Sequence, residues 1–274
     1  MVTQRLERLR VWAEQIEVPV DVRGDGPPLV FLHGAGGPHL QGDEFLDRLA
    51  QSYTLYMPHH PGTGESDPND VYKLDNLWDL VLLYDELLEG LGLGPVPVIG
   101  HSYGGMLACE LAAHCPGRVS RLVAIAPIGL WREDQPVTTL KWTIAPPQEL
   151  PALLAHDLQA PAVQRFLGSL TPPPGADTET QVKVQARFVW ALASTGKFVW
   201  PIPDKGLRKR LHRIRAPTLI IWGEQDALVP VAYGEEFARR IKGARLEVVR
   251  GAGHLVQLEQ VDRVVPMVLD FLRG

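Results

Sequence analysis

The stretch Val96–Gly105 has the sequence VPVIGHSYGG and is the most informative segment of the 274-residue chain. An apolar, partly β-branched run comes before Ser102, and an alanine-rich helical pattern over Met106–Ala113 follows it. This order predicts a sharp turn that leads from a buried strand into a helix. Gly100 and Gly104 provide the small neighbours that a tight turn requires, and the start of a helix favours negative charge nearby. Ser102 is therefore a candidate nucleophile.

Strand-like and helix-like segments alternate on both sides of this turn. Besides Val96–Ile99, short apolar runs predict strands at Pro28–His33, Tyr53–Met57, Arg121–Ile125, Thr218–Trp222 and Arg245–Val249. Apolar residues at three- and four-residue spacing predict helices over Leu74–Leu91, Thr178–Ala193, Val231–Lys242 and Gln260–Leu272. Such alternation predicts an α/β fold with a mostly parallel central sheet and helices on both of its faces.

Composition and charge exclude several classes of protein. The chain carries 27 Lys and Arg against 32 Asp and Glu, with a net charge of -5 and no basic cluster, so nucleic acid is not an expected partner. No apolar run approaches the roughly 18 residues of a membrane span, and the N-terminal residues lack the apolar stretch of a secretory signal. We expect a cytoplasmic protein that has no contact with a membrane.

Cys109 and Cys115 are the only two cysteines. On one helix, six residues of rise separate them by about 9 Å, which is too far for a disulfide. Neither residue belongs to a close Cys/His cluster of the kind that binds zinc. We expect two free thiols and no metal.

A serine nucleophile needs a base, and the base needs a carboxylate that orients it. The C-terminal third offers Asp226, just after the predicted strand Thr218–Trp222, and His254, just after the last predicted strand. The carboxyl ends of parallel strands share one edge of a sheet, where ligands bind. We therefore expect Ser102, Asp226 and His254 to meet at that edge.

Alternatives to these assignments lie elsewhere in the chain. Asp134 follows the predicted strand Arg121–Ile125 and is a competing acid, as is Glu224. Asp226 is also a candidate N-cap of the next helix, which is compatible with a catalytic role. The remaining histidines are expected in turns, helix flanks or the segment 131–203.

Together, these motifs resemble those of the α/β-hydrolase-fold enzymes that carry a helical cap, and the resemblance covers nearly the whole chain outside residues 131–203. His33–Gly37, with the sequence HGAGG, is similar to the family's glycine loop, which supplies one backbone N–H of the oxyanion hole. The resemblance assigns that donor to Ala35, with Gly36 as second choice. It assigns the other donor to Tyr103, the residue after the nucleophile.

A further motif, Pro58–Asp67, is similar to the family's D-x-P-G-x-G-x-S-D turn, but His59 stands where Asp is usual. The departure affects hydrogen bonding within the turn and leaves the catalytic assignment unchanged. We interpret His59 and His60 as turn histidines, with a second catalytic role as the alternative.

Residues 131–203 interrupt the alternation of strands and helices. They are too many and too structured for a loop, so they predict an inserted helical subdomain. The resulting division is an α/β-hydrolase core of residues 1–130 and 204–274, with residues 131–203 as a helical cap.

Aromatic residues of the inserted segment are candidates for an apolar lid over the serine. Trp131, Trp142 and Trp190 are the predicted substrate-binding residues, and Phe188, Phe198 and Trp200 are further members of the predicted lid. The alternative is that such aromatics fill the core of the segment itself. Lys183 and Arg187 are spaced to share one helix face, where they either meet a substrate carboxylate or face solvent.

The resemblance implies a serine hydrolase that cleaves a carboxylic ester, or a closely related acyl bond, of a small and largely apolar substrate. The reaction passes through an acyl-enzyme and requires no cofactor. Two alternatives stay open: a hydrolase of carbon–carbon bonds in aromatic meta-cleavage products, and a non-catalytic small-molecule receptor of the same fold. A homo-oligomer is compatible with the sequence.

Overall fold

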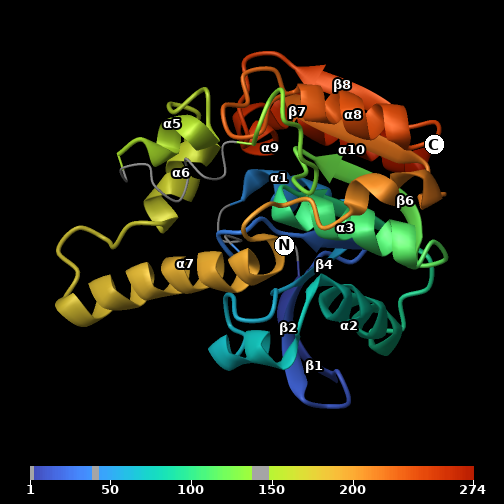
Figure 1. Ribbon diagram of the computed structural model, residues 1–274. Helices are drawn as coiled ribbons and strands as arrows, with labels where there is room; N and C mark the ends of the chain where they lie inside the picture. The colour runs from blue at the N-terminus through green and yellow to red at the C-terminus, as the bar shows by residue number, and fades with distance from the viewer. Residues whose placement is uncertain (1–2, 39–42, 138–147) are drawn as a thin grey trace.

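The computed structural model describes residues 3–38, 43–137 and 148–274 (Figure 1). Its centre is an eight-stranded sheet in the order β1-β2-β4-β3-β5-β6-β7-β8. The strands are β1 (Gln4–Val11), β2 (Ile16–Arg23), β3 (Pro28–Leu32), β4 (Thr54–Pro58), β5 (Val96–His101), β6 (Val119–Ile125), β7 (Thr218–Gly223) and β8 (Arg245–Val249). All neighbours from β4 to β8 in this order pair in parallel, whereas β2 pairs antiparallel with both β1 and β4. The predicted mostly parallel sheet is confirmed.

Helices cover both faces of this sheet (Figure 1). The helices of the core are α1 (Glu44–Leu49), α2 (Leu77–Gly90), α3 (Tyr103–His114), α8 (Ala232–Arg240), α9 (Val256–Glu259) and α10 (Val261–Arg273). In one group, α1 contacts α9 and α10, and in the other, α2 contacts α3. Both α3 and α8 also contact the short helix η3 (Leu211–Arg213), which joins them on the second face. The strand residues between these layers are almost fully buried.

No strand is predicted from the sequence before residue 28, but the structure contains a hairpin there. Its β1 strand, QRLERLRV, is exposed along most of its length, whereas β2, IEVPVDVR, is largely buried. The two are joined by a turn in which Trp12, Ala13 and Glu14 all have positive φ angles. Strand β1 pairs with β2 alone and has polar side chains on its outer face, so it lacks the apolar character by which the other strands were recognised.

Close packing of α3 against the sheet requires glycine at the β5–α3 turn. A Cβ atom at Gly104 would lie 2.0 Å from the carbonyl oxygen of Leu32 in β3, and one at Gly100 would lie 2.2 Å from the carbonyl oxygen of Gly104. No side chain fits at those distances. Cys109 is buried in α3, and Cys115 follows the helix; both are free, as predicted.

The described residues of the inserted segment form three helices: α5 (Leu150–Leu154), α6 (Pro161–Ser169) and α7 (Thr178–Val199). They lie to one side of the sheet rather than on either of its faces (Figure 1). The predicted helix Thr178–Ala193 is present and continues for six further residues, to Val199. Helix α7 contacts η1 (Pro68–Lys73), which belongs to the core, so the segment rests on the α/β unit.

Candidate active site

Ser102 lies at the turn between β5 and α3 with backbone angles φ 54° and ψ -115°. Positive φ is unfavourable for a residue with a side chain, so the surrounding structure must hold this conformation. The Ser102 N–H donates to Ile125 O in β6 at 2.9 Å. Its own carbonyl accepts from Met106 N at 3.0 Å and from Ile128 N at 3.2 Å. The strained turn is thus fixed to the sheet on one side and to α3 on the other.

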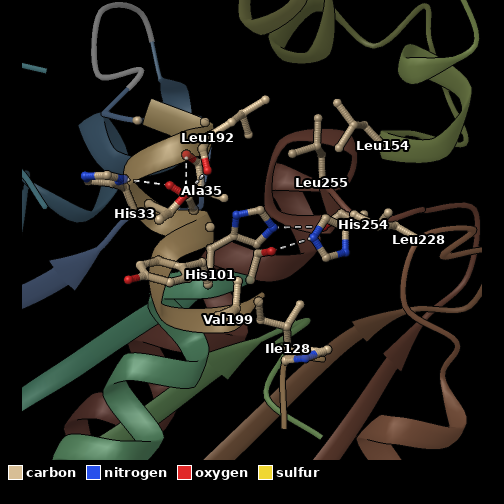
Figure 2. A pocket seen from close by; sticks show the side chains of 18 of the residues that line it. His33, Ala35, His101, Ile128, Leu154, Leu192, Val199, Leu228, His254 and Leu255 are labelled. Atoms are coloured by element: carbon tan, nitrogen blue, oxygen red, sulfur yellow. Dashed lines mark hydrogen bonds between the residues drawn. The ribbon is translucent and has the colours of Figure 1, made fainter. Parts of the chain in front are cut away.

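Three side chains from distant parts of the chain form a continuous row of hydrogen bonds. Ser102 Oγ lies 2.8 Å from His254 Nε2, and His254 Nδ1 lies 2.8 Å from Asp226 Oδ2 (His254 is labelled in Figure 2). The second oxygen, Asp226 Oδ1, accepts from Leu228 N at 2.9 Å and from Val229 N at 2.8 Å. The carboxylate is therefore held on both sides, and it leaves the Nε2 atom of His254 facing the serine. A proton can pass along this row from serine to histidine.

Asp226 does not cap a helix, in contrast to one alternative from the sequence. Helix α8 begins at Ala232, and its N-cap residue is Val231. Asp226 instead caps the turn that follows β7. The competing acids lie apart from the histidine: Asp134 pairs with Arg132 on the surface, and Glu224 is exposed.

The loop that carries His254 is tied to the inserted segment by Glu259 of α9. The carboxylate accepts from the backbone N–H groups of Gly253, His156 and Asp157, each at 2.8 Å. A Cβ atom at Gly253 would lie 2.7 Å from His156 N, so only glycine allows the two backbones to approach this closely. Burial raises the pKa of the Glu259 carboxyl, and the three N–H donors oppose that effect.

His101 supports His254 from the other side. Its Nε2–H donates to the carbonyl oxygen of His254 at 3.0 Å, and the two rings lie 5.1 Å apart. Burial, with a smaller contribution from the nearby His254, lowers the pKa of His101 to about 3. His101 is therefore neutral and acts here as a structural neighbour of the base.

The glycine loop lies beside Ser102, as the predicted oxyanion hole requires. Gly37 N donates to Gly34 O at 3.3 Å and closes a turn around Ala35 and Gly36. Among the described residues, no backbone acceptor takes the N–H of Ala35, Gly36 or Tyr103. These amides are therefore available to an oxygen atom bound next to the serine.

Buried histidines brace this loop. His33 Nδ1–H donates to Gly34 O at 2.7 Å, and His33 Nε2 accepts from His60 N at 3.2 Å. His60 Nε2–H in turn donates to His33 O at 2.8 Å, and its Nδ1 accepts from the Tyr84 hydroxyl. Burial lowers the pKa of His60 to about 4, so His60 stays neutral. His59 begins the turn after β4, and its Nε2 atom lies 2.9 Å from Asp21 Oδ2 of β2, which agrees with its interpretation as a turn histidine.

Ser102, His254 and the glycine loop line one cavity of about 620 Å³ (Figure 2). Most of its wall is apolar and comes from both the core and the inserted segment. Its Phe, Ile, Leu, Val and Trp side chains are those of Phe31, Ile128, Leu154, Phe166, Phe188, Leu192, Val199, Trp200, Leu228, Leu255 and Leu258. A volume of this size matches sites for small organic ligands, which run from roughly 300 to 1,000 Å³.

The predicted aromatic lid is correct in part: Phe188 and Trp200 line the cavity, whereas Phe198 does not. Neither Trp131 nor Trp190 lines the cavity: the Trp131 indole donates to Glu133 at 2.9 Å, and the Trp190 indole donates to Pro68 O at 3.2 Å. Trp142 lies outside the described residues. The reason for Trp190 is its place on α7: it follows the cavity-lining Phe188 by two positions, which turns it about 200° around the helix axis.

The lining residues on α7 have helical spacing, at Phe188, Leu192, Thr195 and Val199. The spacing can be recognised in the sequence, but the sequence does not show which side of the helix faces the serine. Lys183 and Arg187 lie on another side of the helix and pair with Glu179 and Glu65, in ion pairs that are largely exposed.

His, Cys, Asp and Glu side chains in the described ranges form no group of three or more that could hold a metal ion. Among the helices that the structure describes, none combines the length and apolar character needed to cross a membrane.

Comparison with known proteins agrees with this geometry. The sequence profile of the alpha/beta hydrolase fold family matches residues 27–261, and the chain belongs to this family. It is 27% identical to a 2-hydroxy-6-oxo-6-phenylhexa-2,4-dienoate hydrolase of Comamonas testosteroni, over 91% of this chain and 89% of that protein. It is 26% identical to the human monoacylglycerol lipase ABHD6, over 91% of this chain and 76% of the lipase.

Solved structures show the same fold. An esterase from Exiguobacterium antarcticum superposes with a TM-score of 0.76, at 21% identity, over 97% of this chain and 99% of the esterase. At this identity the superposition establishes the fold only. Together with the family match, these relatives identify the protein as an α/β hydrolase related to carbon–carbon bond hydrolases and to lipases.

Proposed function

We propose that this hydrolase cleaves the carboxylic ester of a small, largely apolar substrate through an acyl-enzyme. The observation that carries the proposal is the row Ser102–His254–Asp226, with 2.8 Å contacts, opening into an apolar cavity. Residues 131–203 act as the cap in this proposal, since α5, α6 and α7 all contribute to the cavity wall. A cytoplasmic location and a homo-oligomeric assembly stay predictions from the sequence.

In the first half of the reaction, Ser102 Oγ attacks the ester carbonyl while His254 Nε2 takes the hydroxyl proton. Asp226 holds the imidazole by its Nδ1–H and stabilises its positive form. The carbonyl oxygen becomes an oxyanion that accepts from the N–H groups of Ala35 and Tyr103, which can contribute several kcal/mol in a dry pocket. His254 then gives its proton to the departing alcohol, and the acyl group stays on Ser102.

In the second half, His254 takes a proton from a water molecule that attacks the acyl-enzyme. The same two amides hold the second oxyanion, and the acid leaves as Ser102 recovers its proton. The fixed positions of Asp226 and His254 serve both halves, because the imidazole needs only to exchange one proton at Nε2.

The charge of the cavity favours an ester over a dienoate. The Comamonas relative is named for a dienoate, whose carboxylate would need a cationic partner. Among the described residues of the cavity wall, Lys197 is the one Lys or Arg, and its Nζ donates to Val71 O at 2.9 Å. An uncharged acyl group needs no cationic partner in the cavity wall. The carbon–carbon reading is the second candidate, supported by this relative.

The test uses p-nitrophenyl butanoate and octanoate beside one aromatic meta-cleavage diketone. We expect ester turnover with a burst of p-nitrophenol, and a fall in kcat of at least about 10³-fold in Ser102→Ala. The matched control is Ser52→Ala, which changes an exposed serine and should leave the rate unchanged.

Each other result selects a different function. Turnover of the diketone without the esters would replace the proposal with carbon–carbon hydrolysis. Binding of the compounds with no turnover would favour a receptor.

A further inference from the structure

Gln257 is a polar side chain in the cavity wall that the proposed reaction does not use. It lies on α9, three residues after His254, and is only 4% exposed. Its Oε1 atom is buried and has no hydrogen-bond partner. A buried carboxamide oxygen without a partner destabilises the folded protein. A methionine of similar length would avoid that cost, so the glutamine requires an explanation.

The other polar groups of the described cavity wall differ from Gln257 because they already have partners. Thr195 Oγ1 donates to Ala191 O, Lys197 Nζ donates to Val71 O, Asp43 accepts from Leu46 N, and His101 donates to His254 O. The Tyr103 hydroxyl also lacks a partner, but its ring packs edge-on against His60 at 5.2 Å, in the core cluster. Gln257 is thus the candidate for contact with a polar group of the substrate.

The position of Gln257 in the chain indicates which part of an ester it meets. Three residues of chain span at most about 11 Å, so Gln257 stays close to the base, His254. His254 Nε2 delivers its proton to the departing alcohol oxygen, so the alcohol half of the ester must lie next to this histidine. The amides of Ala35 and Tyr103 fix the carbonyl oxygen.

We infer that Gln257 recognises a free hydroxyl group in the alcohol half of the substrate. The preferred substrate class is then a monoester of a diol or polyol, with an apolar acyl chain. This inference rests on the proposed ester hydrolysis at Ser102. A hydroxyl group suits the site because it donates to Oε1, and it can equally accept from Nε2 when the carboxamide is turned over.

The test compares esters that differ only in the exchange of a methyl for a hydroxyl group. The alcohol pair is 3-hydroxypropyl hexanoate and butyl hexanoate, and the acyl pair is butyl 6-hydroxyhexanoate and butyl heptanoate. We expect wild-type kcat/KM to favour 3-hydroxypropyl hexanoate about fivefold or more over its partner, the effect of one hydrogen bond. In Gln257→Met this preference should disappear, while the ratio within the acyl pair stays the same. The control Gln51→Met changes an exposed glutamine and should leave both ratios unchanged.

The ratio separates recognition from general damage, because a merely misfolded fraction lowers both rates of a pair equally. Equal wild-type rates for the alcohol pair would overturn the inference, and this result needs no variant. A change in the acyl pair instead would overturn the placement of Gln257 at the alcohol half.

If wild-type protein hydrolyses none of the esters, the proposed function fails separately. The inference is then decided by the affinity of Ser102→Ala for the alcohol pair, measured by calorimetry with and without Gln257→Met. A preference for the hydroxyl ester that Gln257→Met removes would uphold it, and equal affinities would overturn it.

Discussion

Removing the Glu259 carboxylate tests how the loop of His254 is held. In Glu259→Ala, three backbone N–H groups lose an acceptor at 2.8 Å: those of Gly253, His156 and Asp157. The Gly253 N–H is buried, so leaving it unpaired costs about 1–3 kcal/mol. The other two are partly buried and can bond to water, so they add roughly 1 kcal/mol together. We expect the free energy of unfolding to fall by about 2–4 kcal/mol.

The same change should lower activity, because His254 directly follows Gly253 in the chain. We expect kcat for p-nitrophenyl butanoate to fall about tenfold or more in Glu259→Ala, as small displacements of a catalytic group are costly. Stability is measured by urea unfolding followed by tryptophan fluorescence. The control is Glu235→Ala, an exposed glutamate of α8, which should change the free energy of unfolding by less than about 0.5 kcal/mol. If Glu259→Ala unfolds like this control and keeps full kcat, the tie has no role.

Two further predictions concern the core. Gly104→Ala places a Cβ atom 2.0 Å from Leu32 O, so we expect the free energy of unfolding, measured by thermal unfolding, to fall by about 3 kcal/mol or more. The control is Gly117→Ala at an exposed position with open space, which should leave the free energy of unfolding unchanged. Equal melting of the two variants would contradict the close approach. His60 and His101 stay neutral when folded, with pKa values of about 4 and 3 against 6.5. Below pH 6.5 each histidine takes up a proton when the protein unfolds but not while it is folded. The free energy of unfolding should therefore fall by about 1.4 kcal/mol per histidine for each pH unit between pH 6.5 and about pH 4. Denaturant midpoints measured from pH 7 to pH 4 check this, and a flat profile would refute it.

Much of the fold was predictable because its strands are buried on both faces and its helices have one apolar side. Apolar runs such as Thr218–Trp222 have few other uses, and six such predicted strands match strands of the sheet. The hairpin was missed because β1 alternates charged side chains with few apolar ones and is largely exposed. Strand β1 is held by its pairing with β2, and its own sequence indicates that pairing only weakly.

The site, like the fold, has residues that could be predicted from the sequence and residues that could not. Ser102, Asp226 and His254 follow strand ends, and the sheet topology then places them at one edge. The cavity wall was harder, since Phe188 and Trp190 belong to one helix and only its rotation decides which faces the serine. The unpartnered carboxamide of Gln257 depends on what every neighbour does with its own hydrogen bonds, which no local pattern reports.

Helix α7 has a consequence for how this enzyme can diversify. Its face of Phe188, Leu192, Thr195 and Val199 shapes the chamber, whereas the serine, the imidazole and the carboxylate come from loops at the ends of sheet strands. This part of the cavity wall is thus encoded apart from Ser102, Asp226 and His254 in the gene. A mutant library confined to these four codons should change the preferred length of the substrate's acyl chain. It should leave the serine, the imidazole and the carboxylate in place.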